Sequence, residues 1–292
     1  MGLLIRENVA HGHVLAYSLS GTGQGEGGEV SRETLARSPL MFHVKPPLVR
    51  CKGLDVNSEA ILRSALERAG FSENSRNIEL MGRHLDAVLE ANQRINLTAI
   101  RNVDSAVLLH VVDSLMCTSE LADAPEGPLA DLGSGAGFPG VPLAIVSGRE
   151  AVLVESVGKK ASFLREVVGR LGLEGRVRVE SARAEELARS DRGRFAAVTA
   201  RAVSSLPALV ELASPLLMQG GRLIALKGRM DPEEVESGRA VGELVGMSAG
   251  EPRQYRLLGR EDARSCVTFT KIGSETIDLP RRNGMAQRRP LR

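Results

Sequence analysis

The chain has 292 residues, of which 42% are hydrophobic and 25% charged, and its formal net charge is only +2. This composition is ordinary for a soluble globular protein, and a chain of this length can bury a full core without disulfides or metals. The three cysteines are far apart in sequence, which argues against a zinc site or a redox pair. The small net charge neither requires nor excludes a nucleic-acid partner.

The sequence has neither the pattern of a signal peptide nor that of a membrane span. No apolar run approaches the roughly 20 residues that a membrane span needs. The segment from Met1 to Glu7 reaches a charged residue too early for a signal peptide. A sparse and odd number of cysteines fits a reducing compartment. We therefore expect a cytoplasmic monomer with no membrane partner and no metal.

The two ends of the chain do not read as folded structure. Residues 1–50 include the glycine-rich run 21–28, which cannot hold a helix or bury a face. Met41 is a second plausible start within this extension. Residues 276–292 are basic, and we expect them to be a disordered tail.

Residues 51–125 are expected to form a small helical region. Apolar residues recur at helical spacing near 59–66 and 77–94. A third helix is expected to begin after Asp104 or Ser105. The proline-containing stretch before residue 129 ends this layer.

Residues 126–275 alternate short apolar strands with helices, which predicts a mostly parallel α/β sheet of seven strands with helices on both faces. Strands are expected near 129–132, 151–157, 177–181, 195–200, 222–227, 255–259 and 266–272. Helices are expected near 139–147, 159–171, 184–189, 204–218 and 232–245. The last two strands lack a helix between them, so an antiparallel hairpin at one edge is expected.

A glycine loop follows the first strand. Gly133, Gly135 and Gly137 allow a sharp turn and a close backbone approach to a ligand, and Pro139 suits the first turn of a helix. Strand, turn and helix start together predict a nucleotide pocket at the carboxyl edge of the sheet.

Two cofactors compete for this pocket. Residues 135–140 match the dinucleotide pattern G-x-G-x-x-G. However, the turn already begins at Gly133, and Asp131 at the strand end gives the D-x-G-x-G-x-G form used for S-adenosylmethionine. A carboxylate beside the loop can meet the ammonium group of that cofactor.

The neighbouring strands supply further candidates. Glu155 ends the second strand, where it can bind two ribose hydroxyls of either cofactor. A dehydrogenase usually needs a His, Lys or Tyr acid/base, but all five histidines precede residue 111. This inventory favours S-adenosylmethionine and a Rossmann-like class I methyltransferase sheet. In the turn after the third strand, the Ala184 N–H and the Glu185 carboxylate are candidates for the adenine edge, although Glu185 also suits a solvated helix start.

The loop after the fourth strand bears on the methyl acceptor. Residues 198–205 lack the prolines and aromatic residue used for exocyclic amines, and no cysteine follows a proline as in pyrimidine C5 methylation. An acceptor that needs no covalent help remains, such as guanine N7. Three cations at strand ends, Arg183, Arg201 and Lys227, are expected to form one positive rim with a catalytic role on RNA. The alternative is that each neutralises a local acid.

Several motifs together resemble one known family. They are Asn96 to Ile100, Asp113 to Leu115, Asp131 to Pro142, Gly158 to Lys160, Thr199 to Ala202 and Leu226 to Gly228. In this order and spacing the chain resembles the glucose-inhibited division protein B family over about residues 55–272. The resemblance implies transfer of a methyl group from S-adenosylmethionine to a guanine N7 of bacterial 16S (small-subunit) rRNA, giving 7-methylguanosine.

The resemblance also implies site residues. It predicts that Gly133, Phe138, Ala184, Glu185 and Arg201 contact or border the cofactor. Arg201 thus has two candidate roles, the cofactor carboxylate or the acceptor guanine. The substrate is either naked rRNA or an assembled 30S subunit. Two rival hypotheses are a small-molecule methyltransferase on the same fold and a non-catalytic RNA-binding assembly factor.

Overall fold

The computed structural model describes residues 56–292. The expectations for residues 1–50, including the start at Met41, lie outside the described residues. The three expected helices of region 51–125 are present within the described residues. The elements of this region are α1 (Val56–Arg68), α2 (Ser75–Ala91), α3 (Val103–Ala106), the π-helical η1 (Val107–Val112), α4 (Asp113–Leu115) and α5 (Thr118–Ala122). The third expected helix is divided into α3, η1 and α4, and α5 follows it.

Polar caps explain where two of these helices begin. The Asn74 side chain accepts the Asn77 N–H at 2.9 Å before α2, and the Asn102 side chain accepts the Ser105 N–H at 2.8 Å before α3. Such side chains satisfy backbone N–H groups that have no partner within the first turn.

The sheet has eight strands, one more than expected. They are β1 (Leu129–Leu132), β2 (Ala151–Val154), β3 (Val177–Glu180), β4 (Phe195–Arg201), β5 (Leu217–Lys227), β6 (Met247–Ala249), β7 (Arg253–Tyr255) and β8 (Arg264–Lys271). The order is β3-β2-β1-β4-β5-β8-β6, and β7 also pairs with β8. The pairs from β3 to β5 are parallel, whereas β8 is antiparallel to β5, β6 and β7. The additional strand β6 was missed because it has only three residues.

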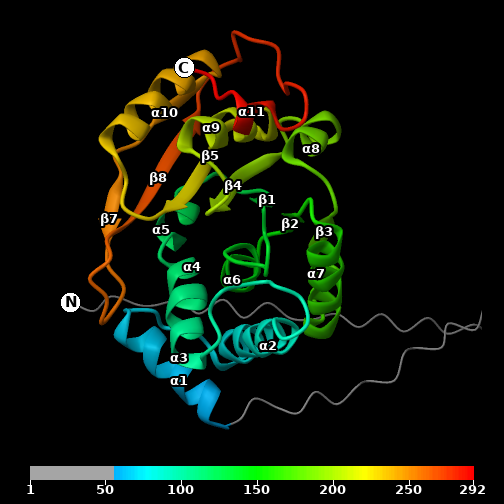
Figure 1. Ribbon diagram of the computed structural model, residues 1–292, viewed down its shortest axis with the longest axis vertical. Coiled ribbons are helices and arrows are strands. Elements are labelled where there is room, and N and C mark those ends of the chain that lie inside the picture. The colour runs from blue at the N-terminus through cyan, green and yellow to red at the C-terminus, as the bar shows by residue number, and fades with distance from the viewer. Residues whose placement is uncertain (1–55) are drawn as a thin grey trace, which may run out of the picture. The chain divides into compact units, whose positions relative to one another are not determined.

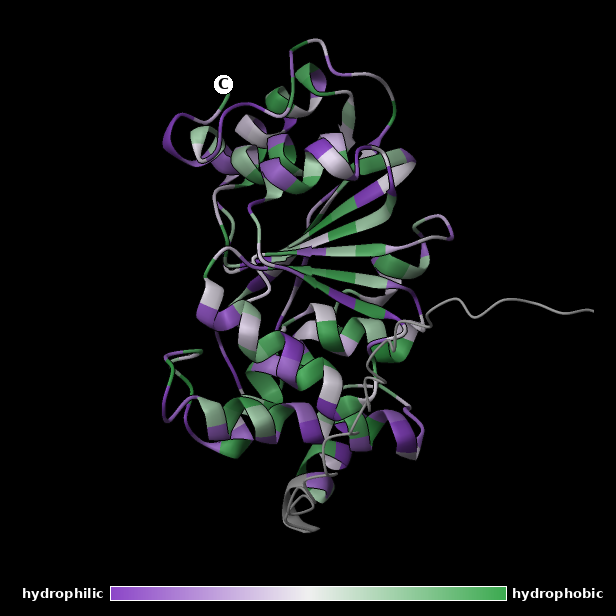
Figure 2. Cartoon of the chain, turned by 90° about the vertical axis from the view of Figure 1, so that its right-hand side faces the viewer, coloured by the Kyte–Doolittle hydropathy of each residue, from purple (hydrophilic) through white to green (hydrophobic). Residues whose placement is uncertain are grey.

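Helices cover both faces of the sheet, as the alternating pattern predicted (Figure 1). They are α6 (Gly140–Ser147), α7 (Gly158–Leu171), α8 (Ala184–Ser190), α9 (Leu206–Ala213) with η2 (Ser214–Leu216), α10 (Pro232–Leu244) and α11 (Met285–Arg288). One buried cluster joins α1, α2, η1, α6 and α7 to one face of the sheet, and a second joins α8, α9 and α10 to the other. Figure 2 shows the apolar strands between these two helical layers.

One helical run differs from expectation. Val103–Ala122 is long and apolar enough to cross a membrane by length and composition, although we expected no such run. However, 56% of its most apolar window is buried inside the protein, and Val111 and Leu115 within it belong to the core. We therefore interpret this run as a core helix.

The C-terminal residues also differ from expectation. We expected residues 276–292 to be disordered, but they contain α11, and Leu279 and Ala286 are buried. The Arg281 guanidinium donates to both carboxylate oxygens of Glu211, at 2.6 and 2.5 Å. Arg281, one of the basic residues that suggested a solvated tail, therefore has an acidic partner on the folded domain, which charge counting along the sequence does not reveal.

Candidate active site

The glycine loop turns sharply after β1, as predicted. Gly133, Gly135 and Gly137 have φ values of 66°, 57° and 94°, a conformation that costs little only for glycine. At Gly133 a steric reason is added, because a Cβ atom there would lie 2.6 Å from Cγ2 of Val203. The loop therefore requires glycine for both its backbone conformation and its contact with the β4–α9 loop.

Asp131 is completely buried beneath this loop. Its Oδ1 accepts the Thr199 hydroxyl at 2.8 Å, and its Oδ2 accepts the Gly140 N–H at 3.2 Å. Burial raises the pKa of this carboxyl to about 6, although the hydrogen bonds oppose the shift. Through these two bonds Asp131 connects β1 to β4 and to the start of α6. Its expected contact with a cofactor ammonium stays a prediction.

Glu155 lies just after β2 and is also nearly buried. Its Oε2 accepts the Gly135 N–H at 3.0 Å, and its Oε1 accepts the Val157 N–H at 2.7 Å. A carboxylate has about four acceptor sites, so each oxygen retains capacity for a hydroxyl group. The residue therefore shapes the glycine loop and can still receive ribose hydroxyls.

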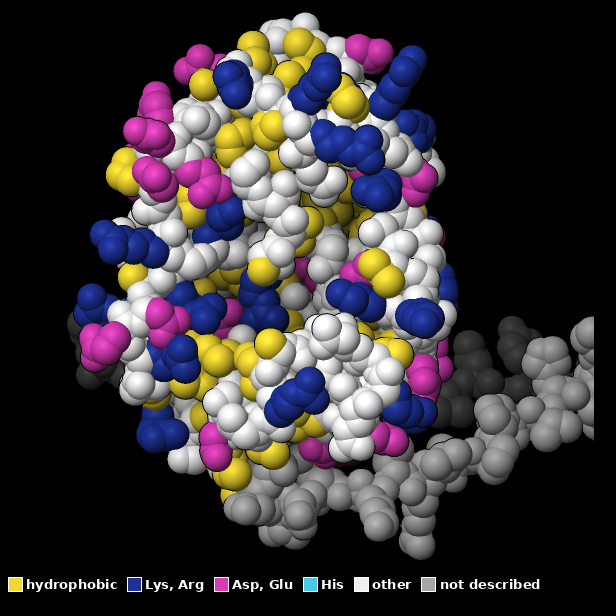
Figure 3. Space-filling model, viewed as in Figure 1, with side chains coloured by type: hydrophobic (Ala, Val, Ile, Leu, Met, Phe, Trp, Pro, Cys, Tyr) yellow, Lys and Arg dark blue, Asp and Glu magenta, His cyan; other side chains and the backbone are white. Residues whose placement is uncertain are grey.

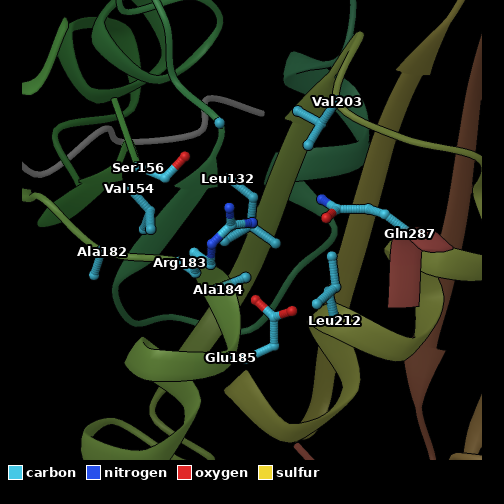
Figure 4. A pocket seen from close by; sticks show the side chains of 11 residues that line it. Leu132, Val154, Ser156, Ala182, Arg183, Ala184, Glu185, Val203, Leu212 and Gln287 are labelled. Atoms are coloured by element: carbon cyan, nitrogen blue, oxygen red, sulfur yellow. The ribbon is translucent and has the colours of Figure 1, made fainter. Parts of the chain in front are cut away.

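A pocket of about 400 Å³ opens beside the loop, and we call it the glycine-loop pocket. It is lined by Leu132, Gly133, Val154, Ser156, Ala182, Arg183, Ala184, Glu185, Val203, Leu212 and Gln287. Figure 4 shows side chains from β1, β2, the β3–α8 turn and α9 around one space. Four of the expected residues, namely Gly133, Arg183, Ala184 and Glu185, therefore meet here, whereas Gly135, Gly137 and Phe138 do not line this pocket.

Phe138 instead lies in a buried stack. Its ring is 4.4 Å from that of His84 and 4.7 Å from that of His110, and the Arg201 guanidinium carbon is 5.6 Å from its centroid. Both histidines precede the sheet domain in sequence, yet they pack against its glycine loop. His84 Nε2 donates to the Ala136 carbonyl at 2.8 Å. Burial lowers the pKa of His84 to about 4 and that of His110 to about 3, so both rings are neutral near pH 7.

A second pocket, which we call the Arg201 pocket, lies beside the ends of β4 and β5. It is lined by Asp113, Arg201, Ala202, Leu226, Lys227, Gly228, Tyr255 and Arg264. Ala202 lines the Arg201 pocket and Val203 lines the glycine-loop pocket. The two pockets therefore share one loop, in which Ala202 takes a φ of 56°.

Asp113 organises the Arg201 pocket. Its Oδ2 lies 3.0 Å from the guanidinium groups of both Arg201 and Arg264, and its Oδ1 accepts the Tyr255 hydroxyl at 2.9 Å. Sequence reasoning did not assign a site role to Asp113, Tyr255 or Arg264. For Asp113 the motif from Asp113 to Leu115 was a signal. For Tyr255 and Arg264, which lie on the antiparallel strands β7 and β8, we find no such signal in the sequence.

The expected single rim of cations is divided between the two pockets. Arg183 lines the glycine-loop pocket, whereas Arg201 and Lys227 line the other. Lys227 also forms an ion pair with Glu234 at 2.9 Å and donates to the Ser204 carbonyl at 2.8 Å. The alternative interpretation, a local acidic partner, therefore applies to Lys227 and Arg201. Figure 3 shows Lys and Arg side chains around the hollow in this face.

Comparison with known proteins agrees with this geometry. The family model described as rRNA small subunit methyltransferase G matches residues 77–255. The chain belongs to the rRNA small subunit methyltransferase G family. It is 40% identical over 240 residues to the ribosomal RNA small subunit methyltransferase G of Chloroflexus aggregans, covering 80% of this chain and 99% of that protein.

Two further relatives carry the same name. The protein of Pelotomaculum thermopropionicum is 36% identical over 241 residues, which covers 82% of this chain and all of that protein. The protein of Deinococcus deserti is 41% identical over 206 residues, which covers 69% of this chain and 84% of that protein. The sequence resemblance to the family and the prediction of a methyltransferase are thus confirmed.

Proposed function

We propose that this rRNA methyltransferase transfers a methyl group from S-adenosylmethionine, bound in the glycine-loop pocket, to N7 of a guanine of 16S rRNA in the Arg201 pocket. One observation carries the proposal: the two pockets meet at Ala202 and Val203. Methyl transfer is an in-line displacement, so two sites lined by adjacent residues of one loop can align donor and acceptor.

The residues of the glycine-loop pocket fit S-adenosylmethionine. Ala184 and Glu185 offer a backbone N–H and a carboxylate for the adenine, and Glu155 lies behind the loop for the ribose. The bound cofactor supplies an electrophilic methyl group on sulfur. In this arrangement the role of the chain is to position the cofactor.

The Arg201 pocket fits a guanine and its phosphate. Three cations, Arg201, Lys227 and Arg264, line this pocket with one carboxylate, that of Asp113, which pairs with the two arginines. Arginine and lysine can donate to O6 of guanine, which leaves the N7 lone pair free to attack the methyl group, and they also bind phosphate. Guanine N7 carries no proton, so no general base is needed. The charged lining disfavours the small-molecule rival, which requires a closed apolar acceptor pocket.

The position of Arg201 favours the acceptor over the cofactor carboxylate. Its guanidinium donates to Asp113 and to the Leu109 carbonyl, and it lines only the Arg201 pocket of the two. We propose that the enzyme works as a cytoplasmic monomer whose substrate is naked 16S rRNA or the 30S subunit.

A methyl-transfer assay tests the proposal. Purified protein is given S-adenosylmethionine labelled on the methyl group together with unmodified 16S rRNA, unmodified 30S subunits or no RNA. We expect label in 7-methylguanosine with at least one of the two RNA substrates. Labelling of another nucleoside, or no labelling of either substrate by a protein that binds the cofactor, would contradict the proposed acceptor.

A further inference from the structure

The C-terminal segment, which we define as residues 276–292, folds back onto the glycine-loop pocket. Gln287 lines this pocket together with residues from β1, β2 and α8. The segment is held on both sides of Pro280. The Arg192 guanidinium donates to the Leu279 carbonyl at 2.7 Å, and Arg281 pairs with the buried Glu211. A long-range set of polar contacts therefore holds this segment in place.

The same segment fixes Glu185. The Gly284 N–H donates to Glu185 Oε1 at 2.6 Å, and this carboxylate is only 4% exposed. Gly284 has a φ of 76°, which favours glycine at this position. Next to it, Asn283 donates to Glu186 at 2.7 Å and accepts from Arg189 at 3.2 Å. The orientation of the proposed adenine carboxylate thus depends on residues about one hundred positions away in sequence.

Gln287 brings a free polar group to the pocket. Gln287 is exposed at the edge of the pocket, its amide makes no hydrogen bond with any residue in the described range 56–292, and its side chain points toward the space between Val203 and Leu212 (Figure 4). An amide offers donors and an acceptor together. Adenine also presents a donor, its exocyclic amine, beside ring-nitrogen acceptors. The chemistry of the two groups is therefore complementary.

We propose that the C-terminal segment is a wall of the cofactor site, in which Gln287 contacts the adenine directly and Gly284 holds Glu185 in its binding orientation. The inference rests on the proposed function, which assigns this pocket to S-adenosylmethionine. It makes residues 276–292 part of the binding site, where the sequence predicted a disordered tail.

Binding of S-adenosylhomocysteine, measured by calorimetry, tests this role. We expect Gln287→Ala to weaken binding about three- to tenfold, the loss of one hydrogen bond. The matched control Gln219→Ala removes the same amide from an exposed position on β5 that lines neither pocket, and should bind as wild type does. In the S-inosyl analogue of S-adenosylhomocysteine, an oxygen replaces the exocyclic amine. Gln287→Ala should weaken binding of this analogue less than it weakens binding of S-adenosylhomocysteine.

The outcomes separate the inference from the proposed function. If wild-type protein binds S-adenosylhomocysteine and Gln287→Ala binds it equally well, the inference is wrong and the function stands. If wild-type protein does not bind it, the proposed function fails. A chain that ends at Asp278 should lose binding more than tenfold. If that chain is folded by circular dichroism and binds normally, the segment is not a wall of the site, and if it does not fold, the point variant decides.

Discussion

Arg201 Nη1 lies 3.0 Å from Asp113 Oδ2, and this ion pair joins the end of β4 to the long N-terminal helical run. The Arg201 side chain is 16% exposed and that of Asp113 only 1%. The acceptor side of the site is therefore built from two parts of the chain that the sequence separates by 88 positions. The helical layer is part of the site, because it supplies the carboxylate that orients the arginine.

Replacing Asp113 by asparagine should destabilise the protein and misplace Arg201. The change removes the charge that compensates two arginines, Arg201 and Arg264. Loss of one partner of a buried ion pair costs about 3 kcal/mol, so urea denaturation should show a loss of that size. The control Asp262→Asn removes an exposed carboxylate 3.5 Å from Arg264 and should leave the midpoint unchanged. Equal midpoints for both variants would contradict this role of Asp113.

Arg183 and Arg201 should affect different kinetic constants, because they line different pockets. We expect Arg183→Ala to raise the KM for S-adenosylmethionine and leave the KM for RNA unchanged. Arg201→Ala should lower kcat/KM for RNA by about ten- to a hundredfold, the value of one or two charged hydrogen bonds. Its affinity for S-adenosylhomocysteine should stay within twofold of wild type. Weakened cofactor binding by Arg201→Ala would instead favour the cofactor-carboxylate role.

A methyl group at Gly133 should damage cofactor binding more than one at Gly135. Both residues have positive φ, so alanine costs about 1 kcal/mol at each. Only at Gly133 does the new Cβ collide with Val203, at 2.6 Å; at Gly135 the nearest atom is 3.8 Å away. We expect Gly133→Ala to weaken S-adenosylhomocysteine binding more than Gly135→Ala does. Adding Val203→Ala to Gly133→Ala should restore part of the loss, and equal effects of the two single variants would refute the steric argument.

The titration of His84 and that of Asp131 should change the free energy of unfolding with pH in opposite directions. Burial lowers the pKa of His84 from 6.5 to about 4. As the pH falls from 6.5 toward 4, the unfolded chain therefore takes up a proton that the folded chain does not, and the protein loses stability. Burial raises the pKa of Asp131 from 3.8 to about 6, so the folded state binds the extra proton and stability is lost as pH rises from 3.8 toward 6.

The free energies of unfolding of His84→Phe and Asp131→Asn, measured against wild type from pH 7 to pH 4.5, test these signs. As the pH falls from 7 to 4.5, the free energy of unfolding of His84→Phe relative to wild type should rise by about 2 kcal/mol. That of Asp131→Asn relative to wild type should fall by about 2 kcal/mol. The wild-type protein serves as the reference at each pH, which cancels the other titrating groups. Shifts of the same sign in both variants would show that burial does not control these two groups.

The strands of the sheet and the glycine loop were predictable because their signals are local. Alternating apolar runs fixed β1 to β5, and the positive φ values of Gly133 and Gly137 follow from a turn that only glycine tolerates. The stack of Phe138 between His84 and His110 was not predictable. It depends on how the helical layer packs against the loop, and no spacing in sequence reports that packing.

The C-terminal segment shows the same limit. Its arginines suggest solvation when they are counted along the chain, yet Arg281 pairs with Glu211 and Gly284 bonds to Glu185. Charge complementarity between distant segments depends on the fold. The place of Asp131 beside the loop was predictable, but its burial and its bond to Thr199 depend on tertiary packing that the sequence does not report.

The most direct test of the account is the modification state of 16S rRNA in the bacterium that encodes this chain. The gene is deleted, 16S rRNA is isolated, and its nucleosides and fragments are analysed by mass spectrometry. We predict that one 7-methylguanosine is lost, that wild-type protein restores it, and that Arg201→Ala protein restores it poorly. A 16S rRNA whose 7-methylguanosine content is the same with and without the gene would contradict the central claim.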